Sequence, residues 1–104
     1  MIDLRALREN SEAYRASQRA RGEDPASIDA ALAADERRRA AVTRADALRA
    51  ESNIASKAIQ TAGADERPAM IERAKVLKEQ VKEAEAEQTV ADAALRVASY
   101  AIAN

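Results

Sequence analysis

The stretch from Met70 to Ile102 decides the fold, and it reads MIERAKVLKEQVKEAEAEQTVADAALRVASYAI. Steps of four and three residues alternate along it and select ten positions, nine of them apolar: Met70, Ala74, Leu77, Val81, Ala84, Gln88, Ala91, Leu95, Ala98 and Ile102. This is the heptad spacing of a coiled coil, and no Gly or Pro interrupts it. Because a helix cannot bury a narrow apolar stripe alone, the pattern predicts a helix that packs against a partner.

A second segment with the same spacing lies upstream and supplies that partner. Its positions are Ala34, Arg38, Ala41, Ala45, Leu48, Ser52, Ala55 and Ile59. When the chain folds back so that Ile59 meets Met70 and Leu48 meets Val81, the other positions pair in order. The turn then falls beside Gly63, in the only turn-like stretch of this half. Two spacing patterns and one turn therefore agree on an antiparallel hairpin.

We expect an all-α fold: a long antiparallel two-helix coiled-coil hairpin with one or two short N-terminal helices packed at its open end. The expected parts of this single domain, residues 1–104, are a short helical preface (1–22), the first arm helix (25–61), a turn (62–67) and the return arm helix (68–102). Pro25 and Pro68 suit the first turns of the two long helices, and Gly22 suits the end of the preface.

The preface carries a few larger apolar side chains. Asp3 and Ser11 are expected to cap its two short helices. Its apolar residues Ile2, Leu4, Leu7 and Tyr14 are expected to pack near Ile28, Leu32, Leu95 and Tyr100. Elsewhere apolar residues make up 47% of the chain, but most of these are Ala and none is Phe or Trp, so we expect a thin core.

Composition excludes several classes of function. The chain has no Cys and no His, and only two Gly, so it offers no thiolate, no imidazole base and no glycine-rich phosphate loop. Its carboxylates are expected to be solvated on exposed helices, which argues against a catalytic centre or a bound cofactor. No apolar run approaches the roughly 20 residues of a membrane span, and no signal-peptide pattern opens the chain. We therefore expect a cytoplasmic protein.

One flank of the outer half of the hairpin is predicted to be basic. Arg49 is expected to face Lys78 across this flank, and Asn53, Lys75 and Lys82 lie on the same side. The net charge of the chain is only −1, so a nucleic-acid-binding role would depend on such a local patch. A basic stripe on a thin rod suits a phosphate backbone. Accidental clustering on a charge-rich surface explains the pattern equally well.

The other charges are expected to be structural. Nearer the base of the hairpin Asp35 is expected to face Asp92 and make the same flank acidic, whereas Arg44 faces Glu87 on the opposite flank. The run of three arginines at residues 37–39 does not form one patch, because successive helical residues point about 100° apart. Arg38 falls on the apolar seam, where it is expected to extend its charge to solvent.

Four segments, taken in order, resemble the N-terminal region of bacterial seryl-tRNA synthetases. The opening residues 1–10, MIDLRALREN, are similar to the start of that family. The run DERRR at residues 35–39 resembles the acidic-then-basic run at the base of the family's first arm helix. Residues 48–53, LRAESN, with SKAI at residues 56–59, resemble the signature near the arm tip. Residues 101–104, AIAN, resemble the segment that leads to the catalytic domain.

The resemblance implies a coiled-coil arm that recognises the long variable arm of serine tRNA. It implies a parent class II aminoacyl-tRNA synthetase, serine-tRNA ligase, whose separate catalytic domain binds ATP and Mg²⁺ and makes seryl-adenylate. It also implies a homodimer in which the arm of one subunit serves the active site of the other. The expected tRNA-binding residues are Arg49, Asn53, Lys57, Lys75, Lys78 and Lys82.

The chain departs from the family near the arm tip. Ser52, Ile54 and Ala55 stand where basic or polar residues are common, and Gln60 stands where Gly is common. These changes reduce the positive charge at the tip and shift the expected tRNA contact toward Arg49 and the three lysines of the return helix. The alternative function is a structural or protein-interaction hairpin with no nucleic-acid role.

Overall fold

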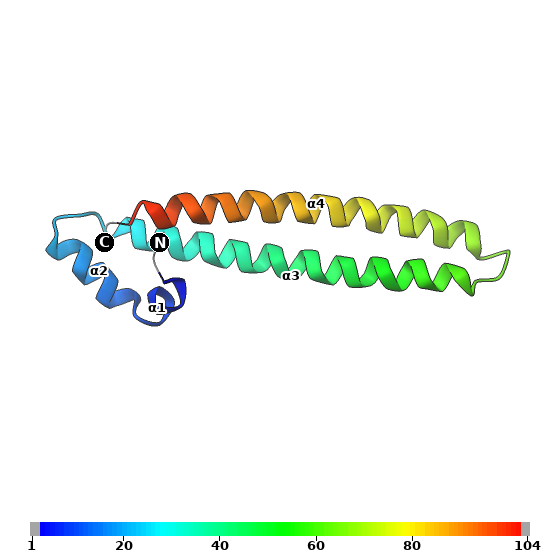
Figure 1. Ribbon diagram of the computed structural model, residues 1–104, viewed down its shortest axis with the longest axis horizontal. Coiled ribbons are helices and arrows are strands. Elements are labelled where there is room, and N and C mark those ends of the chain that lie inside the picture. The colour runs from blue at the N-terminus through cyan, green and yellow to red at the C-terminus, as the bar shows by residue number, and fades with distance from the viewer. Residues whose placement is uncertain (1–2, 103–104) are drawn as a thin grey trace. The chain divides into compact units, whose positions relative to one another are not determined.

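The computed structural model describes residues 3–102. In that range it contains four helices and no β-strand (Figure 1): α1 (Leu4–Glu9), α2 (Ser11–Ala20), α3 (Ala26–Gln60) and α4 (Arg67–Tyr100). The predicted all-α fold is confirmed. The first two and last two residues, which carry part of the family resemblance and the expected contact of Ile2, lie outside the described residues.

The two long helices begin and end close to the expected residues. Asp24 Oδ1 accepts a hydrogen bond of 2.9 Å from the backbone N–H of Ala26, which caps the start of α3. The turn between α3 and α4 covers residues 61–66, and the N–H of Arg67 donates to the carbonyl of Gly63 at 3.0 Å. Helix α4 ends at Tyr100, two residues before the expected end.

The short helices use partly different caps from those expected. Asp3 caps α1 as predicted, because its side chain accepts from the backbone N–H groups of Arg5 and Ala6. Ser11 does not cap α2; it is the first residue of that helix. Its neighbour Asn10 occupies the cap position, but the Asn10 side chain donates to the Ala6 carbonyl rather than capping α2. Gly22 follows α2 with a φ of 76°, the left-handed conformation that commonly ends a helix.

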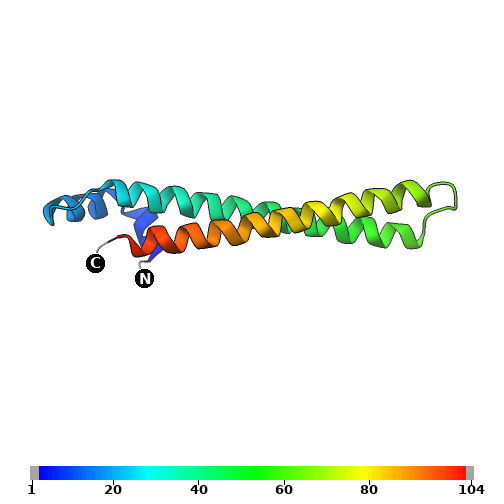
Figure 2. The same ribbon diagram turned by 90° about the horizontal axis from the view of Figure 1, so that it is seen from above.

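The chain forms two compact units. The hairpin unit consists of residues 40–89, and the described part of the terminal unit consists of residues 3–39 and 90–102. Within the hairpin unit α3 and α4 lie antiparallel and side by side in both views (Figures 1 and 2). Every predicted seam position of this unit is buried or half-buried: Ala41, Ala45, Leu48, Ser52, Ala55 and Ile59 on α3, and Met70, Ala74, Leu77, Val81, Ala84 and Gln88 on α4.

The core of the hairpin unit is thin, as its alanines predict. Its most deeply buried residues are Ala45 and Ala84, and Leu77 is its one buried large apolar side chain. Because Ala buries little area, these layers contribute less to stability than Leu layers would. The predicted contact between Leu48 and Val81 stays a prediction, although both side chains are half-buried on the seam.

The terminal unit buries the apolar side chains of the preface. Leu7, Ile28, Ala31 and Ile102 form its core cluster, and Leu4, Tyr14, Leu32 and Ala98 pack against it. The expected packing of the preface is confirmed, except that Tyr100 is 69% exposed and Ile102 contributes to the core instead. Tyr100 lies two residues after the seam position Ala98 and therefore points away from α3.

Ion pairs also stabilise the terminal unit. Asp35 is 3% exposed, and its carboxylate binds Arg8 of α1 at 2.8 Å and Arg39 at 3.3 Å. Asp92 accepts a hydrogen bond of 2.7 Å from Arg38 Nε. The acidic flank expected from Asp35 and Asp92 is therefore wrong, since long arginine side chains reach and neutralise each carboxylate. Arg38 likewise does not merely extend to solvent but pairs with Asp92.

A further ion pair ties α2 to α3 in this unit. Arg15 Nη2 binds Asp29 Oδ1 at 2.6 Å, and this hydrogen bond raises the pKa of the Arg15 guanidinium.

None of the helices in residues 3–102 combines the length and the apolar character that a membrane span requires.

Candidate nucleic-acid interface

The six predicted tRNA-binding residues all lie in the hairpin unit. Arg49, Asn53 and Lys57 are on α3, and Lys75, Lys78 and Lys82 are on α4. Five are exposed, and Arg49 is half-buried beside the seam. The fold thus brings all six to the surface of one unit, and their contact with RNA stays a prediction.

Arg49 forms two ion pairs that the sequence analysis did not predict. Its Nη1 binds Asp46 at 2.7 Å, one turn earlier on α3, and its Nη2 binds Glu85 of α4 at 3.3 Å. The expected repulsion between Arg49 and Lys78 stays a prediction, and the two carboxylates offset the charge of the Arg49 guanidinium. The spacing of three residues between Asp46 and Arg49 is a signal that sequence reasoning missed.

The three lysines of α4 form the clearest basic feature of this flank, and we call them the lysine stripe. Lys75, Lys78 and Lys82 follow one another at steps of three and four residues, so they share one face of the helix. Lys75 lies 3.4 Å from Glu72, in a pair whose two side chains are about 70% exposed. Within the described range, Lys78 and Lys82 form no ion pair within 4.0 Å. Their ammonium groups are therefore available to an anion in solution.

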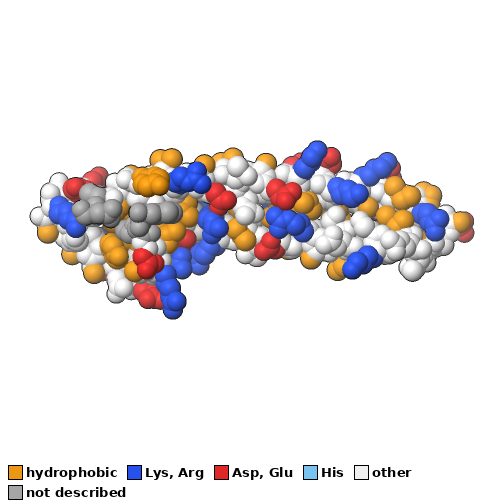
Figure 3. Space-filling view, in the orientation of Figure 1, with side chains coloured by type: hydrophobic (Ala, Val, Ile, Leu, Met, Phe, Trp, Pro, Cys, Tyr) orange, Lys and Arg blue, Asp and Glu red, His pale blue; other side chains and the backbone are white. Residues whose placement is uncertain are grey.

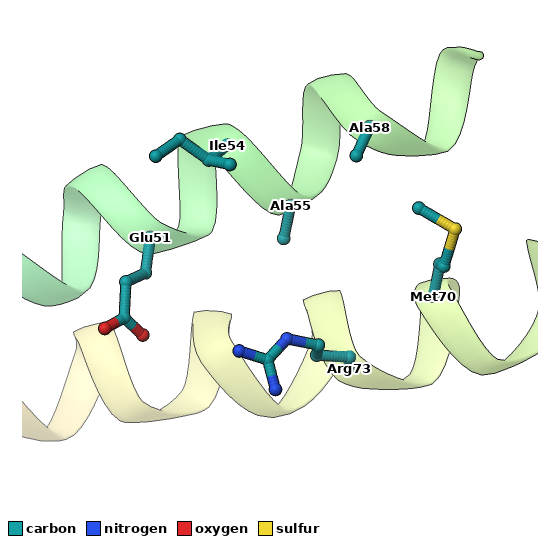
Figure 4. A pocket seen from close by; sticks show the side chains of 6 residues that line it. All are labelled: Glu51, Ile54, Ala55, Ala58, Met70 and Arg73. Atoms are coloured by element: carbon teal, nitrogen blue, oxygen red, sulfur yellow. The ribbon is translucent and has the colours of Figure 1, made fainter. Parts of the chain in front are cut away.

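The opposite flank of the hairpin unit carries a structural ion pair and a groove. Arg44 Nη1 binds Glu87 Oε2 at 2.8 Å, which confirms the pair predicted for this flank. Nearer the turn lies a groove of about 270 Å³, with an apolar floor between α3 and α4 (Figure 4). Its lining residues are Glu51, Ile54, Ala55, Ala58, Met70 and Arg73. Sequence reasoning did not identify this groove.

The surface of the chain mixes charges of both signs. The face in Figure 3 shows basic, acidic and apolar side chains intermixed rather than one continuous basic surface. In the part of the chain that the structure describes, no three His, Cys, Asp or Glu side chains gather to hold a metal ion. The lysine stripe places flexible cations along an exposed helix, and such cations attract anions.

Comparison with known proteins gives one consistent result. The family model described as the seryl-tRNA synthetase N-terminal domain matches residues 1–104. The chain is 62% identical to a serine–tRNA ligase of Mycolicibacterium smegmatis, 61% to one of Acidothermus cellulolyticus and 55% to one of Mycobacterium bovis. The whole chain aligns in each case, but it spans only 25% of the length of these relatives. No solved structure matched significantly.

Proposed function

This chain belongs to the seryl-tRNA synthetase N-terminal domain family, and on that basis we propose that it is a tRNA-binding arm. Its RNA target is serine tRNA, and the hairpin unit recognises the long variable arm of that tRNA. The observation that carries the proposal is the lysine stripe, in which Lys78 and Lys82 are exposed and have no ion partner among residues 3–102.

The stripe binds phosphates in a simple electrostatic way. Lys78 and Lys82 lie four residues apart, so their like charges repel each other in the free protein. Phosphates that contact each lysine relieve that repulsion, and their neutralisation releases counterions from the RNA. Because such contacts read the backbone, the shape and position of the RNA arm select the target, rather than its base sequence.

Arg49 contributes to binding by exchanging partners. Its contact with Glu85 is 3.3 Å long, and both side chains are about half exposed, so the pair is weak. A phosphate near Arg49 competes with Glu85 for the guanidinium and offers two oxygens in the geometry that arginine prefers. Asp46 and Glu85 position Arg49 in the free protein. By competing for its guanidinium, they also weaken the non-specific binding of anions to Arg49.

The rest of the activity belongs to other parts of a longer protein. The relatives are named serine–tRNA ligases, and the chain spans a quarter of their length. We place ATP and Mg²⁺ binding and the formation of seryl-adenylate in a separate catalytic domain. We also place the contact between subunits of a homodimer in that domain, and the whole protein in the cytoplasm.

A protein-interaction role is the second candidate. The terminal unit exposes Val90, Val97 and Tyr100 on α4, with more than half of each side chain accessible. Val90 and Val97 lie seven residues apart, about two helical turns, and so share one face of α4. Exposed apolar side chains on one face favour contact with another protein surface. This role does not require the lysine stripe, so substitutions in the stripe separate the two candidates.

The test replaces Lys78 by Glu and, as a matched control, Arg37 by Glu. Both residues are exposed cations without an ion partner within 4.0 Å in the described range, but Arg37 lies in the terminal unit and not in the lysine stripe. Each variant is titrated with a long-variable-arm tRNA at roughly 50 to 200 mM salt. Lys78→Glu should weaken binding and lower the salt slope by about one, whereas Arg37→Glu should change both much less. Equal binding by the parent chain and Lys78→Glu would show that the stripe is only a solvated face.

A further inference from the structure

The groove on the flank opposite the lysine stripe has the form of a small binding site. Ala55 and Ala58 of α3 make part of its floor, because their short side chains leave space between the helices (Figure 4). Ile54 borders this floor and is 69% exposed, and Met70 of α4 lies across from Ala58. The result is an apolar surface that remains open to solvent beside the seam.

Two opposite charges border this apolar surface without neutralising each other. Glu51 extends from α3 toward α4, and the side chain of Arg73 runs along α4 toward the side on which Glu51 lies (Figure 4). Neither forms an ion pair within 4.0 Å with any residue of the described part of the chain. Arg44 and Glu87, on the same flank, do form such a pair. The groove therefore offers a free cation, a free anion and an apolar floor.

We propose that this groove binds one unpaired nucleobase of the bound RNA, an inference that rests on the proposed tRNA-binding function. A flat aromatic base fits an open apolar floor, and the Met70 thioether makes favourable contacts with aromatic rings. The volume of about 270 Å³ lies just below the roughly 300 to 1,000 Å³ of small-molecule pockets, which suits a single base.

The two charges set the orientation of this nucleotide. Arg73 binds the phosphate next to the base, or stacks its planar guanidinium on the ring. Glu51 accepts hydrogen bonds from an exocyclic amino group or a ribose 2′-hydroxyl and repels phosphate from its end. An apolar protein side chain in the same place would bring both charges out of water without pairing either of them. Charge complementarity therefore favours a nucleotide, which offers a phosphate to Arg73 and hydrogen-bond donors to Glu51, over an apolar protein segment.

The groove and the stripe require an RNA that contacts both flanks of the hairpin unit. Each helix is only about 10 to 12 Å wide with its side chains, so a folded RNA with two neighbouring arms reaches both flanks. The stripe would then contact the phosphates of one arm, and the groove would hold an unpaired base of another. A simple RNA duplex has no unpaired base and engages only the stripe.

The experiment compares Ile54→Ser with Val76→Ser. Both residues are exposed apolar residues of the hairpin unit, 69% and 56% accessible, but Val76 does not line the groove. Each variant is titrated with a long-variable-arm tRNA and with a blunt RNA duplex of similar length. Circular dichroism checks that the melting temperature is unchanged, and sedimentation velocity measures self-association.

Ile54→Ser should weaken tRNA binding about fivefold, because the apolar area that Ile54 buries against the base is lost. The salt slope should stay unchanged, since no phosphate contact is lost. Duplex binding by Ile54→Ser and tRNA binding by Val76→Ser should both match the parent. Arg73→Gln should also weaken tRNA binding and lower the salt slope by about one if it contacts the phosphate.

Three results would overturn the groove as a base site. The first is unchanged tRNA binding by Ile54→Ser, and the second is an equal loss of affinity for tRNA and for the duplex. The third is a loss of self-association in Ile54→Ser, which would assign the groove to a second copy of the chain. The first two leave the proposed function intact if the parent still binds tRNA with a steep salt slope. Failure of the parent to bind tRNA at low salt would instead remove the proposed function and the base site together.

Discussion

Replacement of Asp35 by Asn should lower the free energy of unfolding by about 2 kcal/mol. The side chain of Asp35 is 4% exposed and accepts from Arg8 at 2.8 Å and contacts Arg39 at 3.3 Å. Asn keeps the volume but loses the charge, and a hydrogen bond to a charged group contributes about 1.5 to 3 kcal/mol. The side chains of Arg8 and Arg39 are 36% and 54% exposed, so water partly solvates both guanidinium groups in the variant. The expected loss of free energy of unfolding therefore stays near the value of one charged hydrogen bond.

Urea denaturation followed by circular dichroism measures this loss, with an unchanged m-value as the sign that the compactness of the two states is preserved. A double-mutant cycle with Arg8→Gln should give a larger coupling energy to Asp35 than the cycle with Arg39→Gln, because the Arg8 contact is shorter and less exposed. The control is Arg5→Gln, which removes the exposed Arg5–Glu9 pair and should cost less than about 0.5 kcal/mol. If the free energy of unfolding of Asp35→Asn lies within about 0.5 kcal/mol of that of the parent, the reasoning is refuted. The buried carboxylate and its two arginine partners would then not stabilise the terminal unit.

Three other changes have expected outcomes of known sign. Leu77→Ala should cost about 2 to 4 kcal/mol in urea unfolding, because Leu77 is 5% exposed, whereas Val76→Ala on the exposed face should cost little. Gly22→Ala should lower the melting temperature and cost about 1 kcal/mol for the positive φ alone, whereas Gly63→Ala, which has open space and no positive φ, should be neutral or slightly stabilising. Lys78→Glu should change the unfolding free energy by less than about 0.5 kcal/mol, because Lys78 has no ion partner within 4.0 Å in residues 3–102; a larger loss would show a structural role.

The two heptad patterns and the turn between them were sufficient to predict the helical hairpin. Positions such as Ala45, Leu77 and Ala84 are buried because a period near 3.5 residues forces them onto one face of each helix. The Arg44–Glu87 pair was equally predictable, since the same register places the two residues on one flank. These features depend on backbone geometry, which the sequence pattern determines directly.

The partners of long charged side chains were not predictable in the same way. Arg49 was expected to face Lys78, but its long, flexible side chain forms ion pairs with Asp46 and Glu85. Asp35 pairs with Arg8, which lies 27 residues earlier in a short helix whose packing no periodicity describes. Flank positions therefore identify possible partners, but the side-chain rotamers decide among them.

The groove was also beyond the reach of the sequence. Ala55 and Ala58 predict a close approach of two helices as readily as they predict a hollow, and only the three-dimensional packing shows which of these occurs. Ile54 was seen only as a loss of polar character at the tip. Its exposure at the edge of a groove that Met70 and two unpaired charges also line connects it to the proposed base site, which its residue type alone did not indicate.

The most direct measurement is a titration of the parent chain with two tRNAs that differ in their variable arm, one long and one short, across roughly 50 to 200 mM salt. A tRNA-binding arm specific for the long variable arm should bind the first tRNA more tightly at every salt concentration. The logarithm of its affinity should fall linearly with the logarithm of the salt concentration, with a slope that reflects at least two phosphate contacts, one each from Lys78 and Lys82. Equal affinity for both tRNAs would contradict recognition of the variable arm, and absence of binding at low salt would contradict a tRNA-binding role for this chain.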